Sequence, residues 1–260
     1  MGKGKVYLVG AGPGDEKLIT VKGLECIQKS DCIVYDRLIN SSLLDYAPQY
    51  AEKIFCGKFP GKHMLIQEEI HELLVQKASE GKTVTRLKGG DPSVFGRVGE
   101  EAVVLKEAGI PFEIVPGITS SIAAAEYAGI PVTHREFASS FALVTGHGRE
   151  EKGTDFLNWK ALATGIDTIA FYMGVGNLEN ICKKLIEFGK PSDTPVAIIE
   201  NGTTIDQRTI TGTLQTIYIR AMEEKITNPA MIIVGNVVKV REKASWYEDL
   251  IEQTKEISLI

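Results

Sequence analysis

The sequence has few of the residues that build disulfide frameworks or metal centres. Four cysteines and four histidines occur in 260 residues. The cysteines are widely spaced without a CxxC pair, and the histidines form no HExxH pattern. We therefore expect reduced cysteines packed in the interior and no metal site.

The chain also lacks long apolar runs and an excess of positive charge. No stretch approaches the roughly 20 apolar residues of a transmembrane helix, and the apolar stretch near the N-terminus is too short for a signal peptide. A net charge of −5 counts against a general nucleic-acid binder, because phosphate contacts need a basic surface. We expect a cytoplasmic protein that binds neither membrane nor nucleic acid. An anionic small substrate is not excluded, since a local basic pocket can lie in an acidic protein.

Short β-rich runs alternate with helical patterns along the chain. The runs predict strands at residues 6–9, 32–35, 53–56, 84–87, 112–115, 141–145, 168–172, 196–199, 207–211 and 231–234. The helical patterns cover residues 20–29, 67–80, 99–107, 120–128, 178–187 and 214–223. In the first half this alternation predicts a mostly parallel sheet with helices on both faces. A second series of strands and helices begins near Phe141. We therefore predict two α/β domains, residues 1–133 and 134–242. A helical tail over 243–260 follows, with Trp246 as a possible anchor.

The turn Gly10–Asp15 follows the first apolar run and suggests a ligand near a strand end. A dinucleotide fingerprint requires GxGxxG, but Asp15 stands at the third glycine and Pro13 removes an amide. Asp36 lies where the ribose-binding acid of a dinucleotide site would stand. One acid at that position does not compensate for the missing third glycine. Gly81-Lys82-Thr83 matches the end of a phosphate-binding loop. The pattern also requires a glycine at position 76, where this chain has Gln76, so a phosphate-binding loop is not predicted.

Two further turns strengthen the prediction of a ligand site. The segment Arg86–Pro92 follows a buried run with paired glycines and an acid, and Pro116–Ser121 joins a strand to a helix. Glycine pairs let a ligand approach the backbone, whereas Ser and Thr in such turns often serve only as helix caps. Three glycine-rich turns at strand ends of one sheet are expected to converge on one crevice.

Several ordered motifs together resemble the tetrapyrrole methylase family. The resemblance covers roughly residues 6 to 240. It rests on VYLVGAGPGD (6–15), YDRLI (35–39), GK (57–58), RLKGGDPSVFGR (86–97), PGITSSIAAAEYAGIPVTHR (116–135), YMG (172–174), ENGT (200–203) and NPAMIIVG (228–235).

This resemblance implies a homodimer of two-domain subunits, in which the C-terminal domain has a mixed sheet. S-adenosylmethionine would lie in a ligand cleft between the domains and leave as S-adenosylhomocysteine. The residues implied to bind it are Pro13, Gly89, Gly90, Asp91, Val94, Thr119, Ser120, Met173, Gly202 and Ala230. For Met173, filling the core is the alternative.

The implied reaction is C-methylation of uroporphyrinogen III at C2 and C7 to precorrin-2, on the route to sirohaem and cobalamin. Asp36 would accept a proton and Lys58 would donate one. Alternatively, Asp36 is a helix cap and Lys58 a solvated charge. The substrate carries eight carboxylates, so Arg37 and Arg97 are candidates to bind it, although solvated roles are equally consistent.

Two other functions are consistent with parts of the sequence. A sister precorrin methyltransferase acting on a later corrin intermediate would share the donor site. An NAD-dependent oxidoreductase, from a different class, would require the first loop to tolerate Asp15.

Overall fold

The computed structural model describes residues 2–57, 66–146 and 157–257 and shows two compact units, residues 1–119 and 120–260. The sequence-based division after residue 133 places the helix that begins at Ser120 in the first domain, whereas this helix groups with the second unit. Among the described residues, no helix is both long and apolar enough to cross a membrane.

The N-terminal unit is built on a five-stranded parallel sheet with strand order β3-β2-β4-β1-β5. Its strands are β1 (Lys5–Gly10), β2 (Cys32–Tyr35), β3 (Glu52–Phe55), β4 (Thr83–Lys88) and β5 (Phe112–Val115). Its helices are α1 (Val21–Gln28), α2 (Gln67–Ser79) and α3 (Val98–Glu107), with 3-10 turns η1 (Glu16–Leu18) and η2 (Ser41–Tyr46). The predicted strands agree with these bounds to within two residues.

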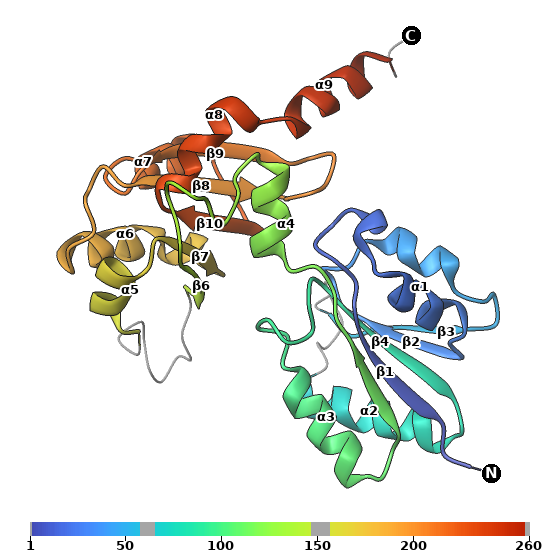
Figure 1. Ribbon diagram of the computed structural model, residues 1–260. Helices are drawn as coiled ribbons and strands as arrows, with labels where there is room; N and C mark the ends of the chain where they lie inside the picture. The colour runs from blue at the N-terminus through green and yellow to red at the C-terminus, as the bar shows by residue number, and fades with distance from the viewer. Residues whose placement is uncertain (1, 58–65, 147–156, 258–260) are drawn as a thin grey trace. The chain divides into compact units, whose positions relative to one another are not determined.

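Helices cover both faces of this sheet (Figure 1). Because side chains alternate along a strand, Val6 and Leu8 of β1 pack with α2 and α3, while Tyr7 and Val9 pack with α1 and η2. Both faces are therefore buried at β1 and β2, which explains why these two strands appear in the sequence as nearly continuous apolar runs.

The C-terminal unit contains a five-stranded mixed sheet with strand order β6-β7-β10-β8-β9. Its strands are β6 (Phe141–Thr145), β7 (Thr168–Tyr172), β8 (Pro195–Glu200), β9 (Arg208–Thr213) and β10 (Ala230–Val234). The pair β6 and β7 is parallel and the remaining pairs are antiparallel. The mixed sheet implied by the family resemblance is thus confirmed.

Helices again cover both faces of the second sheet (Figure 1). The helices of this unit are α4 (Ser120–Tyr127), α5 (Trp159–Gly165), α6 (Leu178–Glu187), α7 (Ile217–Glu223), α8 (Arg241–Ala244) and α9 (Tyr247–Ile257), with 3-10 turns η3 (Val175–Asn177) and η4 (Asn236–Val240). One core joins α5, α6 and α7 to the sheet, and another joins α4 and η4 to its opposite face.

The cysteines confirm the expectation of reduced packing residues. Cys26, Cys32, Cys56 and Cys182 are all free and buried. Burial raises the pKa of the Cys32 thiol to about 11 and that of the Cys182 thiol to about 12.

Candidate functional site

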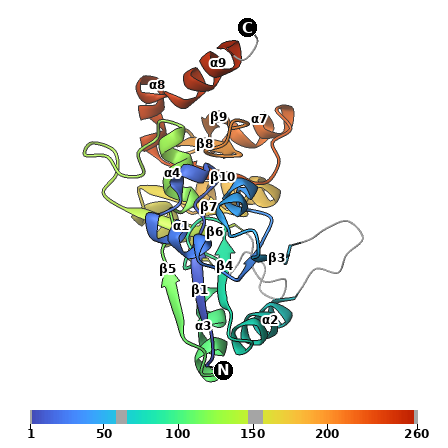
Figure 2. The same cartoon turned by 90° about the vertical axis from the view of Figure 1, so that its right-hand side faces the viewer.

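The glycine-rich turns after β1, β4 and β5 meet at the carboxyl edge of the N-terminal sheet. Figure 2 shows β5, β1 and β4 side by side with their arrowheads at the same end. A β-carbon on Gly10 would lie 2.6 Å from Gly117 Cα and 2.7 Å from the Gly90 carbonyl oxygen. Only glycine permits this approach, and ligands of α/β proteins bind at this edge.

Hydrogen bonds tie the first turn to its neighbours. The Gly12 N–H donates to the Gly90 carbonyl at 3.2 Å, and the Gly90 N–H donates back at 2.7 Å. Asp15 caps η1 by accepting a hydrogen bond from the Lys17 amide at 2.9 Å. The Gly12 amide is therefore bonded within the protein, and the loop leads into a 3-10 turn. Both features agree with the conclusion that this loop is not a dinucleotide fingerprint.

Asp91 joins the second turn to the third. Its Oδ2 accepts a hydrogen bond from the Gly117 amide at 2.9 Å, and its Oδ1 accepts one from the Ser93 amide at 2.8 Å. Burial opposes ionisation of Asp91, but hydrogen bonds from Ser93 and Gly117 outweigh it and hold the Asp91 pKa below its ordinary value. Asp91 is thus a carboxylate that fixes the geometry of both turns.

The structure brings the predicted donor-binding residues of this unit to one sheet edge. They are Pro13, Gly89, Gly90, Asp91, Val94 and Thr119. All of them lie in the turns after β1, β4 and β5. A β-carbon on Gly89 would come within 2.8 Å of Leu38 Cβ, so the segment after β2 lies against the same edge.

Asp36 lies in that segment after β2. Its Oδ1 accepts a hydrogen bond from the Leu38 amide at 3.0 Å, and its Oδ2 lies 3.4 Å from Arg86 Nη2. It therefore stabilises a turn rather than capping an α-helix. Its side chain remains 28% exposed, so a ligand can reach the carboxylate.

Arg86 connects Asp36 to a buried charge cluster, which we define as Asp36, Arg86, Lys88 and Glu101. Glu101 of α3 is fully buried and accepts hydrogen bonds from Lys88 Nζ at 2.9 and 3.0 Å and from Arg86 Nε at 3.3 Å. Burial, together with the neighbouring Arg86 charge, lowers the pKa of Lys88 from its ordinary value. With all four groups ionised, the cluster contains two cations and two anions.

Sequence reasoning missed Arg86, Lys88 and Glu101 as members of a site. A signal was present, because Arg86 and Lys88 stand at alternate positions in a strand buried on both faces. Charged side chains are rarely fully buried unless paired. The sequence does not show that their partner, Glu101, is buried, because a glutamate in a helix is usually exposed.

The other predicted residues of this region differ in their surroundings. Arg37 is exposed. The Arg97 side chain is 50% exposed and forms a two-pronged ion pair with Glu100, with Nε at 2.8 Å and Nη2 at 2.6 Å from the carboxylate oxygens. Lys58 lies outside the described residues.

In the C-terminal unit, Met173, Gly202 and Ala230 come to one edge of the sheet. Ala230 begins β10 and pairs with Glu200 at the end of β8, two residues before Gly202. Because β10 is also antiparallel to β7, the residue that follows β7, Met173, lies at the same edge. Three residues distant in sequence are thus neighbours through strand register.

Helix α4 packs beside this edge and contributes Ser120 at its start. The next residue, Ser121, donates its amide hydrogen to the Tyr172 hydroxyl at 3.1 Å. A β-carbon on Gly202 would lie 2.5 Å from Ala124 Cβ, so the turn after β8 touches the helix directly. We call Ser120, Met173, Gly202 and Ala230 the C-terminal half-site.

Met173 has an unusual backbone and an exposed side chain. Its φ is +54°, and its side chain is 54% exposed, so it does not fill the core. Non-glycine residues with positive φ are uncommon and cluster at functional sites. These properties favour the ligand-facing role of Met173.

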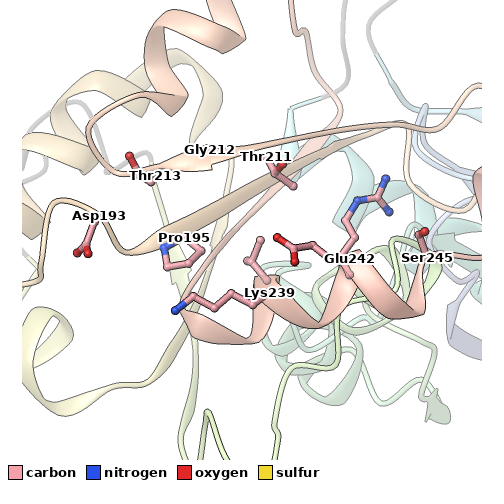
Figure 3. Close-up of a pocket in the computed structure, with 10 residues that line it drawn as sticks. Asp193, Pro195, Thr211, Gly212, Thr213, Lys239, Glu242 and Ser245 are labelled. Carbon is pink, nitrogen blue, oxygen red and sulfur yellow. The ribbon is translucent and has the colours of Figure 1, made fainter.

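A separate cavity of about 500 Å³ opens in the C-terminal unit (Figure 3). It is lined by Asp193, Pro195, Thr211, Gly212, Thr213, Val238, Lys239, Arg241, Glu242 and Ser245. It lies near the start of β8, whereas Gly202 follows the end of that strand, and it contains none of the predicted site residues. Elsewhere in the described residues, no group of three or more His, Cys, Asp or Glu side chains could hold a metal ion.

Residues 5–218 match the family described as Tetrapyrrole (Corrin/Porphyrin) Methylases. The chain belongs to the tetrapyrrole methylase family. The glycine-rich turns of this methylase therefore belong to a shared fold, and the oxidoreductase alternative is set aside.

Two relatives show which members of the family this chain is similar to. The methylase is 62% identical over 235 residues to the uroporphyrinogen-III C-methyltransferase of Priestia megaterium, covering 90% of this chain and 98% of that protein. It is 50% identical to a siroheme synthase of Thiobacillus denitrificans, covering 94% of this chain and 51% of that longer protein. The chain therefore spans about half of the second relative.

A solved structure also resembles this methylase. It is the uroporphyrin-III C-methyl transferase from Thermus thermophilus complexed with S-adenyl homocysteine, with 39% identity and a TM-score of 0.77. The match covers 91% of this chain and 100% of that chain.

Proposed function

We propose that this methylase transfers methyl groups from S-adenosylmethionine to C2 and C7 of uroporphyrinogen III, giving precorrin-2 and S-adenosylhomocysteine. The product would serve sirohaem and cobalamin biosynthesis. The observation that carries the proposal is the similarity, over nearly the whole of both chains, to the Priestia megaterium enzyme.

Both sets of predicted donor-binding residues fit S-adenosylmethionine, which supplies a methyl group on a positively charged sulfur. Gly89 and Gly90 carry no side chains of their own where the chain leaves β4, and the Asp91 carboxylate fixes the adjoining turn. In the C-terminal half-site, Met173 supplies an exposed thioether beside the backbone of Gly202 and Ala230. We propose that residues of each set bind the methyl donor, and that this binding needs no metal.

Asp36 is the proposed proton acceptor. A methylated pyrrole carbon leaves an excess proton on the macrocycle, which a base must remove. The Leu38 amide and Arg86 hold the Asp36 carboxylate in place, while its partial exposure leaves it accessible. Lys58 is the proposed donor of a returning proton. Because methyl transfer cancels the sulfonium charge, exclusion of water would favour it.

Arg37 and Arg97 are the proposed contacts for substrate carboxylates. Arg37 is exposed beside Asp36. Arg97 would exchange its pairing with Glu100 for a substrate carboxylate, since a guanidinium binds both through the same two-pronged geometry. We further propose a homodimer, as the family resemblance implies. From the composition and charge we propose that it is cytoplasmic and binds neither membranes nor nucleic acids.

The first test measures ligand binding by thermal unfolding. S-adenosylhomocysteine should raise the unfolding temperature and NAD should not, because only a ligand that binds the native state stabilises it. Incubation with uroporphyrinogen III and labelled donor should then give a product two methyl groups heavier. Labelling only a later corrin precursor would instead identify the sister methylase.

The role of Asp36 is tested by single-turnover methylation. Asp36→Asn should slow the reaction by about 10²-fold or more, since general base catalysis contributes about that factor. Asp45→Asn, which changes an exposed carboxylate in η2, is the matched control. An unchanged rate for Asp36→Asn would remove the proposed role.

A further inference from the structure

The C-terminal tail, residues 241–257, makes a concentrated set of contacts with two elements of the C-terminal half-site. These elements are helix α4, which begins with Ser120, and the turn after β8, which contains Gly202.

The first contacts fix the end of α4. The Trp246 indole donates its Nε1 hydrogen to the Glu126 carbonyl at 2.9 Å. The Tyr127 ring packs against Trp246 and Tyr247, with centroid separations of 5.0 and 4.6 Å. Arg241 donates to the Ala128 carbonyl at 2.6 Å, which satisfies a carbonyl just past the helix end.

The tail backbone also comes close to the chain that leaves α4. Gly129 has a φ of +71°, and a β-carbon there would lie 2.6 Å from the Ala244 carbonyl carbon and 2.7 Å from the Ser245 nitrogen. This close approach requires glycine. The tail is thus seated against α4 by backbone as well as by side chains.

A second contact fixes the turn after β8. The Tyr247 hydroxyl donates to the Thr203 carbonyl at 3.3 Å. Thr203 is 1% exposed, has a φ of +68° and donates its own amide hydrogen to Gln207 Oε1 at 2.7 Å. A residue held in this sparsely populated conformation needs surrounding contacts to keep it there.

Tyr247 therefore touches both elements, through its ring at Tyr127 and through its hydroxyl at Thr203. The two elements also touch each other where Gly202 meets Ala124. We infer that Trp246 and Tyr247 are positioning residues for the methyl donor, which hold α4 and the turn after β8 in the arrangement that presents Ser120 and Gly202. This inference rests on the proposed function, because it assumes that the half-site binds the donor.

The test is S-adenosylhomocysteine affinity, measured by titration calorimetry on the full chain well below its unfolding temperature. The variant Trp246→Phe/Tyr247→Phe keeps an aromatic ring at both positions and removes the two hydrogen bonds. Its dissociation constant should be roughly threefold to tenfold higher than that of the parent, since a hydrogen bond contributes about 0.5–1.5 kcal/mol. Glu252→Gln, on an exposed position of α9, is the control and should bind like the parent.

If the tail only stabilises the fold, the two measurements give a different result. In that case the double variant unfolds at a lower temperature but binds with parental affinity, and the inference is overturned while the proposed function stands. Hydrogen exchange provides a second measurement: amides of α4 and of residues 201–207 should exchange faster in the folded double variant. If the parent itself fails to bind S-adenosylhomocysteine, the proposed function fails and the inference fails with it.

Discussion

Neutralising Glu101 should strongly destabilise the N-terminal unit. Glu101 is fully buried, and it lies 2.9 Å from Lys88 and 3.3 Å from Arg86, whose side chains are 6% and 5% exposed. Glu101→Gln keeps the shape of the side chain but leaves two buried cations with Asp36 as the remaining anion of the cluster. Breaking a buried ion pair from one side costs about 3–5 kcal/mol, a large part of the roughly 5–15 kcal/mol stability of a typical domain.

The pairing makes two more specific predictions. Lys88→Met in the Glu101→Gln background should restore part of the lost stability, because it removes one of the stranded charges. The penalty of Glu101→Gln should also shrink as the pH rises. Burial already lowers the pKa of Lys88, and losing the nearby carboxylate would favour its neutral form further.

The assay must report on the correct unit. Trp159 and Trp246 both belong to the C-terminal unit, so tryptophan fluorescence is a poor probe of the cluster. Hydrogen exchange of the β1 and β4 amides measures the local opening free energy directly. A loss below about 1 kcal/mol for Glu101→Gln, or strictly additive effects of the two substitutions, would refute the electrostatic reasoning.

Three further predictions concern the turns, the half-site and the substrate. Gly117→Ala should lower the unfolding temperature, because the new methyl group would collide with the Gly90 carbonyl and Gly10. It should also weaken S-adenosylhomocysteine binding in calorimetry. Binding with parental affinity would contradict the idea that close packing of these turns shapes the site. Burial opposes ionisation of Glu200, but hydrogen bonds from Thr227 and Arg208 hold its pKa below the ordinary 4.5. Its stabilisation is therefore present above about pH 4.5 and lost as the pH falls through the lowered value, so urea midpoints of the parent and Glu200→Gln should converge in acid. Raised salt should weaken tetrapyrrole binding more than donor binding, and an equal salt response of both dissociation constants would count against arginine contacts to carboxylates.

The sequence predicted strands better than it predicted short helices. Cys32–Tyr35, Phe112–Val115 and Phe141–Thr145 match the observed strands because buried strands leave compact apolar runs. Helix α5 (Trp159–Gly165) was missed, since it spans seven residues and buries two of them, too few to show a helical period.

The convergence of the three turns was predicted because backbone contacts there dictate the residue type. Glycines at the three converging turns are required by the distances between backbones, so motif reasoning could find them. The buried charge cluster depends on a strand and a helix meeting face to face, which local spacing does not encode. Glu101 thus became recognisable only through its contacts with Arg86 and Lys88.

The burial of every native thiol makes the protein convenient for spectroscopy. Thiolates, not thiols, react with maleimides, and thiols buried with raised pKa values stay protonated at neutral pH. One cysteine introduced at an exposed position would consequently carry a dye or spin label alone, without removal of the other four. Ligand-driven movements of either unit can then be followed in an otherwise unaltered chain.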